Sequence, residues 1–303
     1  MGAMQTWSGM KPIQFAVLST AIYWSVCAAA VAKEPGTPHG PMKAGQIRIE
    51  YVSPPNPAHQ EIYERVKERH VLERFKDYLR PIRLPRPLLL KFDGCDGESN
   101  AWYEPEDHAV TVCYEYIAEV LSEAPEETTE AGVTRDEAIV GPGVEVFLHE
   151  IGHALFDMLK VPILGREEDA ADQIAAYLLL QFGKDEARRT VVGVAYMYGH
   201  QAKGQTPKME QFANVHGLPG QRFYNLLCMA YGADPVLFAD LVEKKYLPES
   251  RAEGCADEYK QVTYAVQKLI APYMDQKLVK KTKARKWLKP SAPADGKSGA
   301  VSQ

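Results

Sequence analysis

The feature that most constrains this chain is the pentapeptide HEIGH at positions 149–153, which lies inside an apolar run. Apolar residues recur every three or four positions from 144 to 160, which predicts one amphipathic helix there. Residues four apart share a helix face, so His149 and His153 can hold a single metal ion between their imidazoles. Glu150 is then near enough to take a proton from a metal-bound water. The motif predicts a helix that carries a catalytic zinc site.

Glycine and proline residues bracket this helix. The Gly-Pro-Gly run at 141–143 predicts a break before it, and the segment 161–165 predicts a second break after it. Another helix is expected from Arg166 to Phe182. A connection of about five residues requires the two helices to lie side by side or to cross closely.

The start of the second helix supplies carboxylates at a useful spacing, because Glu168 and Asp172 share one face. A catalytic zinc site has three protein ligands and leaves a fourth position for water. We therefore expect His149, His153 and Glu168 to bind one Zn²⁺ and Glu150 to act as the general base. Asp172 is expected to accept the ring N–H of a ligating histidine and fix its tautomer.

The motif also allows other interpretations. The metzincin pattern needs a glycine and a histidine where this chain has Phe156 and Leu159, so that class is excluded. Asp169 could replace Glu168 as the third ligand, in an aspzincin-like site. An ordinary helix followed by an acidic helix start is also possible, since carboxylates favour the positive end of a helix dipole.

Three longer segments carry a resemblance to a known family. They are SNAWYEPEDHAVTVCYEYI, HEIGHALFDMLKVPILGREEDAADQIAAYLLL and HGLPGQRFYNLLCMAYGADP. They resemble a bacterial family of zinc metallopeptidases, a domain of unknown function whose motif is gluzincin-like, from about Ile47 to Pro272. The resemblance implies a zinc-dependent hydrolase of peptide bonds. The chain departs from the family pattern at Asn214-Val215-His216, where an acidic residue often precedes the histidine.

The N-terminal residues have the composition of a secretory leader. No charged residue occurs from Pro12 to Ala32, and the run ends in a small-x-small cleavage pattern. We expect a signal peptide at 1–32 and an exported protein, periplasmic or secreted, without a stable membrane span after leader removal. Retention of the leader as an anchor is the alternative. A linker at 33–46, a zincin-like metallopeptidase domain at 47–275 and a basic, disordered tail at 276–303 are expected to follow.

Four cysteines remain once the leader is removed: Cys95, Cys113, Cys228 and Cys255. An even number in an exported chain predicts two disulfides. Three pairings are possible, and proximity in sequence favours Cys95–Cys113 and Cys228–Cys255. The chain contains no C-x-x-C pair, which argues against cysteine ligands for zinc.

The expected fold is α+β and zincin-like, with a small β-sheet, an active-site helix and a mostly helical C-terminal half. Short strands are expected at 47–52, 88–92 and 109–113, with a helix at 58–79 and a turn-rich stretch at 93–100. In a zincin an edge strand borders the cleft and pairs with an extended peptide substrate.

Hydrolysis of an amide also needs a donor that stabilises the oxyanion. His216 and Arg222 in the helical half are candidates, together with Tyr224, although Arg222 could instead pair with carboxylates. His108 is expected at the surface. The net charge of −5 is accompanied by no Gly-rich phosphate loop and no basic aromatic module, so no nucleic-acid partner is predicted.

The sequence thus favours an exported zinc metallopeptidase that acts on a peptide or protein substrate through Glu150. Two alternatives stay open: a zinc-binding envelope protein without peptidase activity, and a zinc amidase acting on cell-wall peptides. The presence of Glu150 argues against the first, because a purely structural zinc site does not need that carboxylate.

Overall fold

The structure is a computed structural model that describes residues 43–204 and 206–283. The expected leader at 1–32, the first part of the linker and the end of the basic tail lie outside the described residues. The described residues belong to one of the two units of the chain, Pro38–Gln303. Among them, no helix combines the length and apolar character that crossing a membrane requires.

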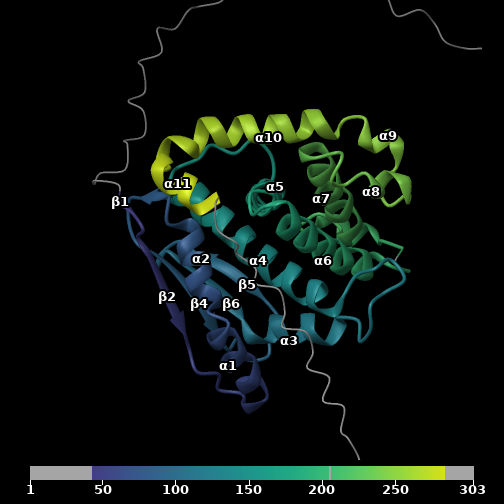
Figure 1. The fold of residues 1–303 in the computed structure, drawn as a ribbon. Coiled ribbons are helices and arrows are strands. Elements are labelled where there is room, and N and C mark those ends of the chain that lie inside the picture. Colours follow the sequence, from purple (N-terminus) through teal and green to yellow (C-terminus); the bar gives the residue numbers. More distant parts are fainter. Residues whose placement is uncertain (1–42, 205, 284–303) are drawn as a thin grey trace, which may run out of the picture. The chain divides into compact units, whose positions relative to one another are not determined.

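A mixed sheet of four strands forms one layer of the described region (Figure 1). Strands β2 (Ile47–Tyr51), β4 (Leu88–Asp93) and β6 (Ala109–Cys113) run parallel, and β5 (Ala101–Glu104) pairs antiparallel with β6 at the edge. The strand order is β2-β4-β6-β5. The expected strands are confirmed as β2, β4 and β6, whereas β5 was not predicted. The two-residue strands β1 (Lys43–Ala44) and β3 (Arg83–Leu84) pair antiparallel in a separate small sheet.

The helix expected at 58–79 is two helices, α1 (Gln60–Glu68) and α2 (Val71–Leu79), preceded by the 3₁₀ turn η1 (Pro57–His59). The break lies at His70, whose φ of 52° places its backbone in the left-handed region. A residue in that conformation cannot continue a right-handed helix. After β6 the chain enters α3 (Tyr114–Glu123).

The rest of the described chain is mostly helical, as expected. Its α-helices are α4 (Arg135–Met158), α5 (Glu167–Leu179), α6 (Lys184–Ala202), α7 (Pro219–Ala233), α8 (Asp240–Glu243), α9 (Glu249–Ala252), α10 (Cys255–Leu269) and α11 (Gln276–Lys283). The 3₁₀ turns η2 (Met209–Ala213) and η3 (Ala271–Tyr273) lie between them. The α+β class is therefore confirmed.

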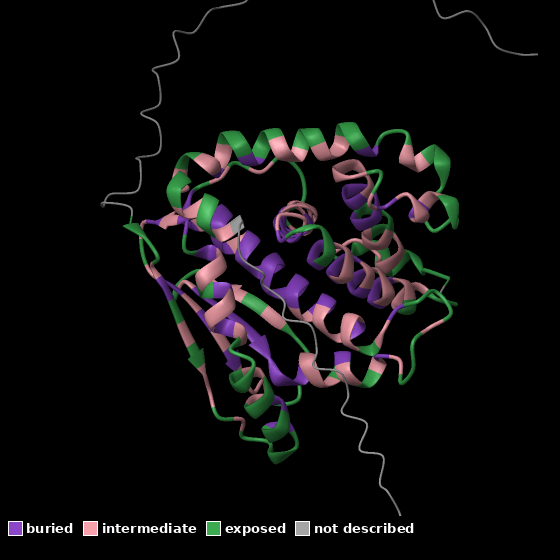
Figure 2. Ribbon diagram, in the orientation of Figure 1, coloured by how far each residue is buried: buried purple, intermediate pink, exposed green. Residues whose placement is uncertain are grey.

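Helix α4 contains the motif and passes through the buried interior of the fold (Figure 2). It begins at a capping box formed by Thr134 and Glu137. The expected break at 141–143 is wrong, because α4 continues through this run. Gly141 serves a close crossing with α6 instead, since a Cβ at this position would lie 2.7 Å from the backbone nitrogen of Val194. Pro142 lacks the N–H for one helical hydrogen bond, but the helix continues past it.

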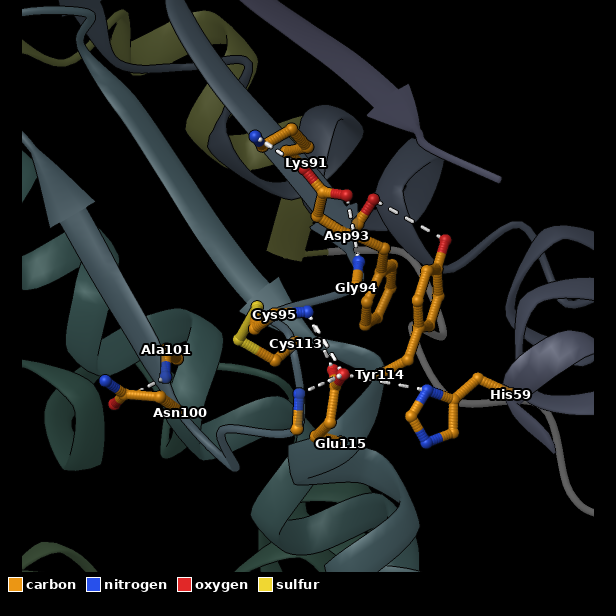
Figure 3. The surroundings of a disulfide bond; sticks show 12 residues. His59, Lys91, Asp93, Gly94, Cys95, Asn100, Ala101, Cys113, Tyr114 and Glu115 are labelled. Atoms are coloured by element: carbon orange, nitrogen blue, oxygen red, sulfur yellow. Dashed lines mark hydrogen bonds and ion pairs between the residues drawn. A yellow bond between two sulfur atoms is a disulfide. The ribbon is translucent and has the colours of Figure 1, made fainter. Parts of the chain in front are cut away.

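Both expected disulfides are present. Cys95–Cys113 joins the loop after β4 to the end of β6, beside the carboxylate of Glu115 (Figure 3). Cys228–Cys255 joins α7 to the start of α10. Two disulfides are consistent with an exported protein.

Candidate metal centre

Helix α4 presents the two motif histidines to the N-terminal end of α5. His149 is buried, and its Nε2 lies 3.2 Å from Nε2 of His153 one turn further along. Gly152 makes room for α5, because a Cβ at Gly152 would lie 2.6 Å from Cγ2 of Ile174. The small residue in the motif therefore allows the second helix to approach the histidines.

Glu168 at the start of α5 completes a triangle with the two histidines. Its Oε2 lies 3.1 Å from His149 Nε2 and 3.4 Å from His153 Nε2. Zinc–ligand bonds of about 2.0 to 2.1 Å in a tetrahedron separate the ligand atoms by about 3.3 to 3.4 Å. The three side chains therefore fit one zinc ion, and two imidazoles with one carboxylate form a donor set that catalytic zinc uses.

Asp169, the alternative third ligand, has a different partner. Its carboxylate accepts two hydrogen bonds from Arg166, each 2.9 Å long. Asp169 and Tyr224 both line a cavity of about 380 Å³ that none of the three candidate ligands lines. The structure thus brings Glu168 and not Asp169 to the histidines, and it places Tyr224 on this separate cavity.

Each histidine also has a carboxylate on the ring nitrogen that points away from the triangle. Asp172 Oδ1 lies 2.8 Å from His149 Nδ1, and Glu167 Oε1 lies 2.8 Å from His153 Nδ1. Such partners fix the ring orientation and leave Nε2 available to a metal. Asp172 therefore contacts a ring nitrogen of a motif histidine, as expected. Glu167 was overlooked, because an acid in the first turn of a helix is common for reasons of the helix dipole alone.

His216 reaches the same group of side chains from the segment between η2 and α7. Its Nε2 lies 2.8 Å from Glu168 Oε2, and its ring stacks on that of His149 with the centroids 5.6 Å apart. His108, by contrast, lies between β5 and β6, where its Nδ1 is 3.3 Å from the Tyr103 hydroxyl. The structure therefore brings His216 to the centre and gives His108 partners elsewhere.

Arg222 on α7 lies behind His149. Its Nε donates to Asp172 Oδ2 at 2.8 Å and its Nη2 to Asp172 Oδ1 at 2.5 Å. The same Nη2 lies 3.4 Å from Oε1 of Glu145. The guanidinium is thus engaged by two carboxylates, which is the second of the two possibilities that the sequence left open.

A cavity of about 450 Å³ opens beside these side chains. Strand β5 contributes Ala101, Trp102 and Tyr103 to one wall. The cavity is also lined by residues of the motif and of α5, α6 and α7, among them His149, Glu150, His153, Glu168, Met197, Tyr198, Gln201 and Arg222. The volume is within the usual range for ligand sites, and the candidate ligands face it.

Burial and hydrogen bonding set the charge of the centre. Burial raises the pKa of Glu150 above its usual value. Burial opposes the charged form of His149, but hydrogen bonds to Asp172 and Glu168 outweigh it and raise its pKa to about 10. The hydrogen bond with His149 lowers the pKa of Glu168 to about 2. Glu168 is therefore an anion at neutral pH and His149 carries a proton there, which a metal ion bound to its Nε2 would have to displace.

Two further residues of the centre were missed by the sequence analysis. Glu145 lies one turn before His149 and is buried, and its Oε1 accepts a hydrogen bond of 2.8 Å from the Tyr198 hydroxyl. An acid within the apolar run of α4 was a usable signal for Glu145. Tyr198 gave none, because it reaches the site from α6 through tertiary packing.

Comparison with known proteins places this centre in a family. The model of a family described as "Putative metallopeptidase" matches residues 51–270, which is well over half of the chain. The matched region contains α4, α5 and α7 with every side chain of the centre, and it confirms the resemblance inferred from the sequence. No curated protein and no solved structure matches the chain. The chain belongs to this metallopeptidase family.

Proposed function

We propose that this chain is an exported zinc-dependent metallopeptidase that hydrolyses peptide bonds in the cavity beside α4. The observation that carries the proposal is the triangle of His149 Nε2, His153 Nε2 and Glu168 Oε2, with sides of 3.1 to 3.4 Å. Zinc held there would act as a Lewis acid that polarises the scissile carbonyl and lowers the pKa of water. The family supports the reaction class, and the two disulfides support export.

Glu150 is the proposed general base. It lies between the two histidines in sequence and lines the cavity, and its side chain is nearly excluded from solvent. Its carboxylate would accept a proton from the attacking water and later deliver that proton to the nitrogen of the leaving amine.

His216 is the proposed oxyanion donor. It lines the cavity, and its Nε2 lies at the edge of the ligand triangle, 2.8 Å from Glu168. An N–H there could donate to the oxygen on which negative charge develops. Arg222 is less suited to this role, because Asp172 and Glu145 already engage its donors. We assign Arg222 to holding Asp172 against His149.

Strand β5 is the proposed binding edge for the substrate backbone. It is the outer strand of the sheet beside the cavity, and one of its edges is left unpaired by the described strands. An extended peptide can add to such an edge through main-chain hydrogen bonds. Trp102 and Tyr103 would then contact the side chains of the bound peptide.

The Glu150→Gln variant tests this proposal. The amide is nearly isosteric with the carboxylate, so the variant should keep its zinc and its melting temperature. It loses the ability to accept and return a proton, and we expect hydrolysis in a broad peptide library to fall by about 10² to 10⁴. Glu126→Gln, at an exposed position, is the matched control and should cleave at the wild-type rate.

The same digest separates the alternatives. Wild type that binds zinc but cleaves no peptide would favour the zinc-binding envelope protein. Cleavage confined to cell-wall peptides would favour the amidase. A Glu150→Gln variant as fast as wild type would show that Glu150 is not the base.

A further inference from the structure

A polar cluster, buried at Glu145 and Tyr198 and half-buried at Asp172 and Arg222, lies behind His149, on its Nδ1 side. It consists of Asp172, Arg222, Glu145 and Tyr198, which come from α5, α7, α4 and α6. Polar side chains are rarely buried without partners, because an unmade hydrogen bond in the interior is costly. Four helices each contribute one polar group to the same place, and the contacts between these groups form a continuous path to His149.

The path can be followed atom by atom. The Tyr198 hydroxyl donates to Glu145 Oε1 at 2.8 Å, and Arg222 Nη2 lies 3.4 Å from that same oxygen. The guanidinium carbon lies 4.5 Å from the centre of the Tyr198 ring. Arg222 then donates twice to Asp172, whose Oδ1 lies 2.8 Å from His149 Nδ1. Glu145 and Tyr198 thus fix Arg222 from one side while Asp172 holds it from the other.

Among the described residues, no hydrogen bond or ion pair joins Glu145 to His149, His153 or Glu168. One of its oxygens could approach the same point as His149 and Asp172, since suitable atoms of the three residues lie within 4.8 Å of one another. A second metal between them is disfavoured, because the Arg222 guanidinium already contacts both carboxylates. A cation therefore occupies the position that a metal would need, and the role left for Glu145 is to hold that cation.

We propose that Glu145 and Tyr198 are positioning residues for the metal ligand His149, acting through Arg222 and Asp172. The inference rests on the metal-binding part of the proposed function and not on the peptidase step. Outer partners of a ligating histidine set its tautomer and orientation, and their loss typically weakens metal binding 10- to 100-fold. Here the set extends beyond the carboxylate that touches the ring by three residues, Arg222, Glu145 and Tyr198.

Zinc affinity, measured by competition with a chromophoric chelator, tests the proposal in the full chain. Tyr198→Phe removes one hydroxyl, and Glu145→Gln removes one charge at nearly constant shape. We expect each to weaken zinc binding about tenfold. Tyr198→Phe decides the question if Glu145→Gln does not fold, since a buried cation that loses its partner can be strongly destabilising.

Two matched controls come from the sheet region. Tyr114 is a buried tyrosine whose hydroxyl also makes a 2.8 Å hydrogen bond, to the carbonyl of Val52. Glu115 is a buried carboxylate that accepts hydrogen bonds from the backbone nitrogens of Cys95 and Gly97. Tyr114→Phe and Glu115→Gln should lower the melting temperature without changing zinc affinity.

An Asp172→Asn background distinguishes positioning from a general loss of stability. If Glu145 acts through Asp172, Glu145→Gln should change zinc affinity by less than about twofold in that background. A purely structural role would lower the melting temperature in both backgrounds and would not depend on Asp172. The visible spectrum of the cobalt-substituted protein should shift in Tyr198→Phe and stay unchanged in Tyr114→Phe, since it reports the ligand field directly.

The outcomes separate the two proposals. Wild-type affinity in both Glu145→Gln and Tyr198→Phe would overturn this inference and leave the proposed function standing. A full tenfold effect of Glu145→Gln in the Asp172→Asn background would also overturn it. A wild-type chain that binds no zinc would overturn the proposed function, and this inference with it.

Discussion

The two walls of the cavity are held in place by different chemistry. On the helical wall, ion pairs and hydrogen bonds lead directly to the candidate metal ligands, as at Asp172 and Glu167. On the strand wall, the loop before β5 is fastened by the Cys95–Cys113 disulfide and by the Glu115 carboxylate (Figure 3). Among the described contacts, neither the Cys95–Cys113 disulfide nor Glu115 contacts a candidate metal ligand.

This difference suggests that the two walls affect different properties of the protein. Groups that touch a ligand can alter metal affinity and the rate of the chemical step. The Cys95–Cys113 disulfide and the Glu115 carboxylate hold only the loop before β5. Changes to them can alter the stability of the chain and the position of the strand edge that a peptide would contact. Changes to the two walls should therefore separate in their effects, and the following variants test that separation.

The largest effect is expected from the helical wall. Glu168→Ala removes a proposed ligand, so zinc affinity should fall by more than about 100-fold, beyond the usual effect of losing an outer partner. Asp169→Ala, one residue further along, removes only the pair with Arg166 and should keep near wild-type affinity. Chelator competition on both variants measures the contrast. The reverse order would transfer the third ligand to Asp169.

On the strand wall, the double variant Cys95→Ser/Cys113→Ser should lower the free energy of unfolding by about 3 kcal/mol. The reason is that the disulfide closes a loop with a sequence separation of 18, which restricts the unfolded chain. Peptidase KM should rise while zinc affinity stays at the wild-type value, as denaturant titration, kinetics and chelator competition can determine.

A labelling experiment on the wild-type cysteines tests the disulfide pairing on which that variant depends. The chain without residues 1–32, denatured but not reduced, should react with a thiol reagent at none of Cys95, Cys113, Cys228 and Cys255. Two or more labelled positions would contradict the pairing. Loss of zinc in the double cysteine variant would contradict the separation of the walls.

The smallest effect is expected at Glu115. Burial opposes its ionised form, but backbone N–H groups, including those of Gly97 and Cys95, and the neighbouring His59 lower its pKa below the usual value. A lowered pKa stabilises the folded state above the ordinary carboxyl pKa of about 4.3, and this stabilisation disappears as the pH falls through the folded-state value. Glu115→Gln should therefore cost about 1 to 2 kcal/mol at pH 7.

Urea titrations of wild type and Glu115→Gln across pH 3 to 8 would measure this dependence. The stability difference should be constant above about pH 6 and shrink below about pH 4. A difference that grows on acidification has the wrong sign for a carboxylate held by N–H donors, and it would remove Glu115 from the account of the strand wall.

Local patterns in the sequence were sufficient for much of the helical wall. Four-residue spacing placed His149 and His153 on one face, and the short connection brought Glu168 and Asp172 to them. These relations depend on helix geometry, which a sequence of this kind determines over one or two turns. The cysteine pairing followed from proximity in sequence, with separations of 18 and 27 residues.

The features that the sequence did not predict share a different cause. Strand β5 is short, it directly follows the turn-rich stretch at 93–100, and its backbone is defined by pairing with β6, so the local sequence gives little sign of it. The run 141–143 looked like a break, because the packing of Gly141 against α6 is invisible in the sequence. Tyr198 and Arg222 meet Glu145 only once three helices are assembled. Long-range packing, not local propensity, determines each of these positions.

The central claim is that His149, His153 and Glu168 together hold one zinc ion. An anomalous difference map at the zinc absorption edge, from crystals of the chain grown with zinc, tests it most directly. The account predicts one peak within about 2.0 to 2.2 Å of the two Nε2 atoms and of a Glu168 carboxylate oxygen. A peak at another place, or one in which His216 or Asp169 stands in for Glu168, would contradict it.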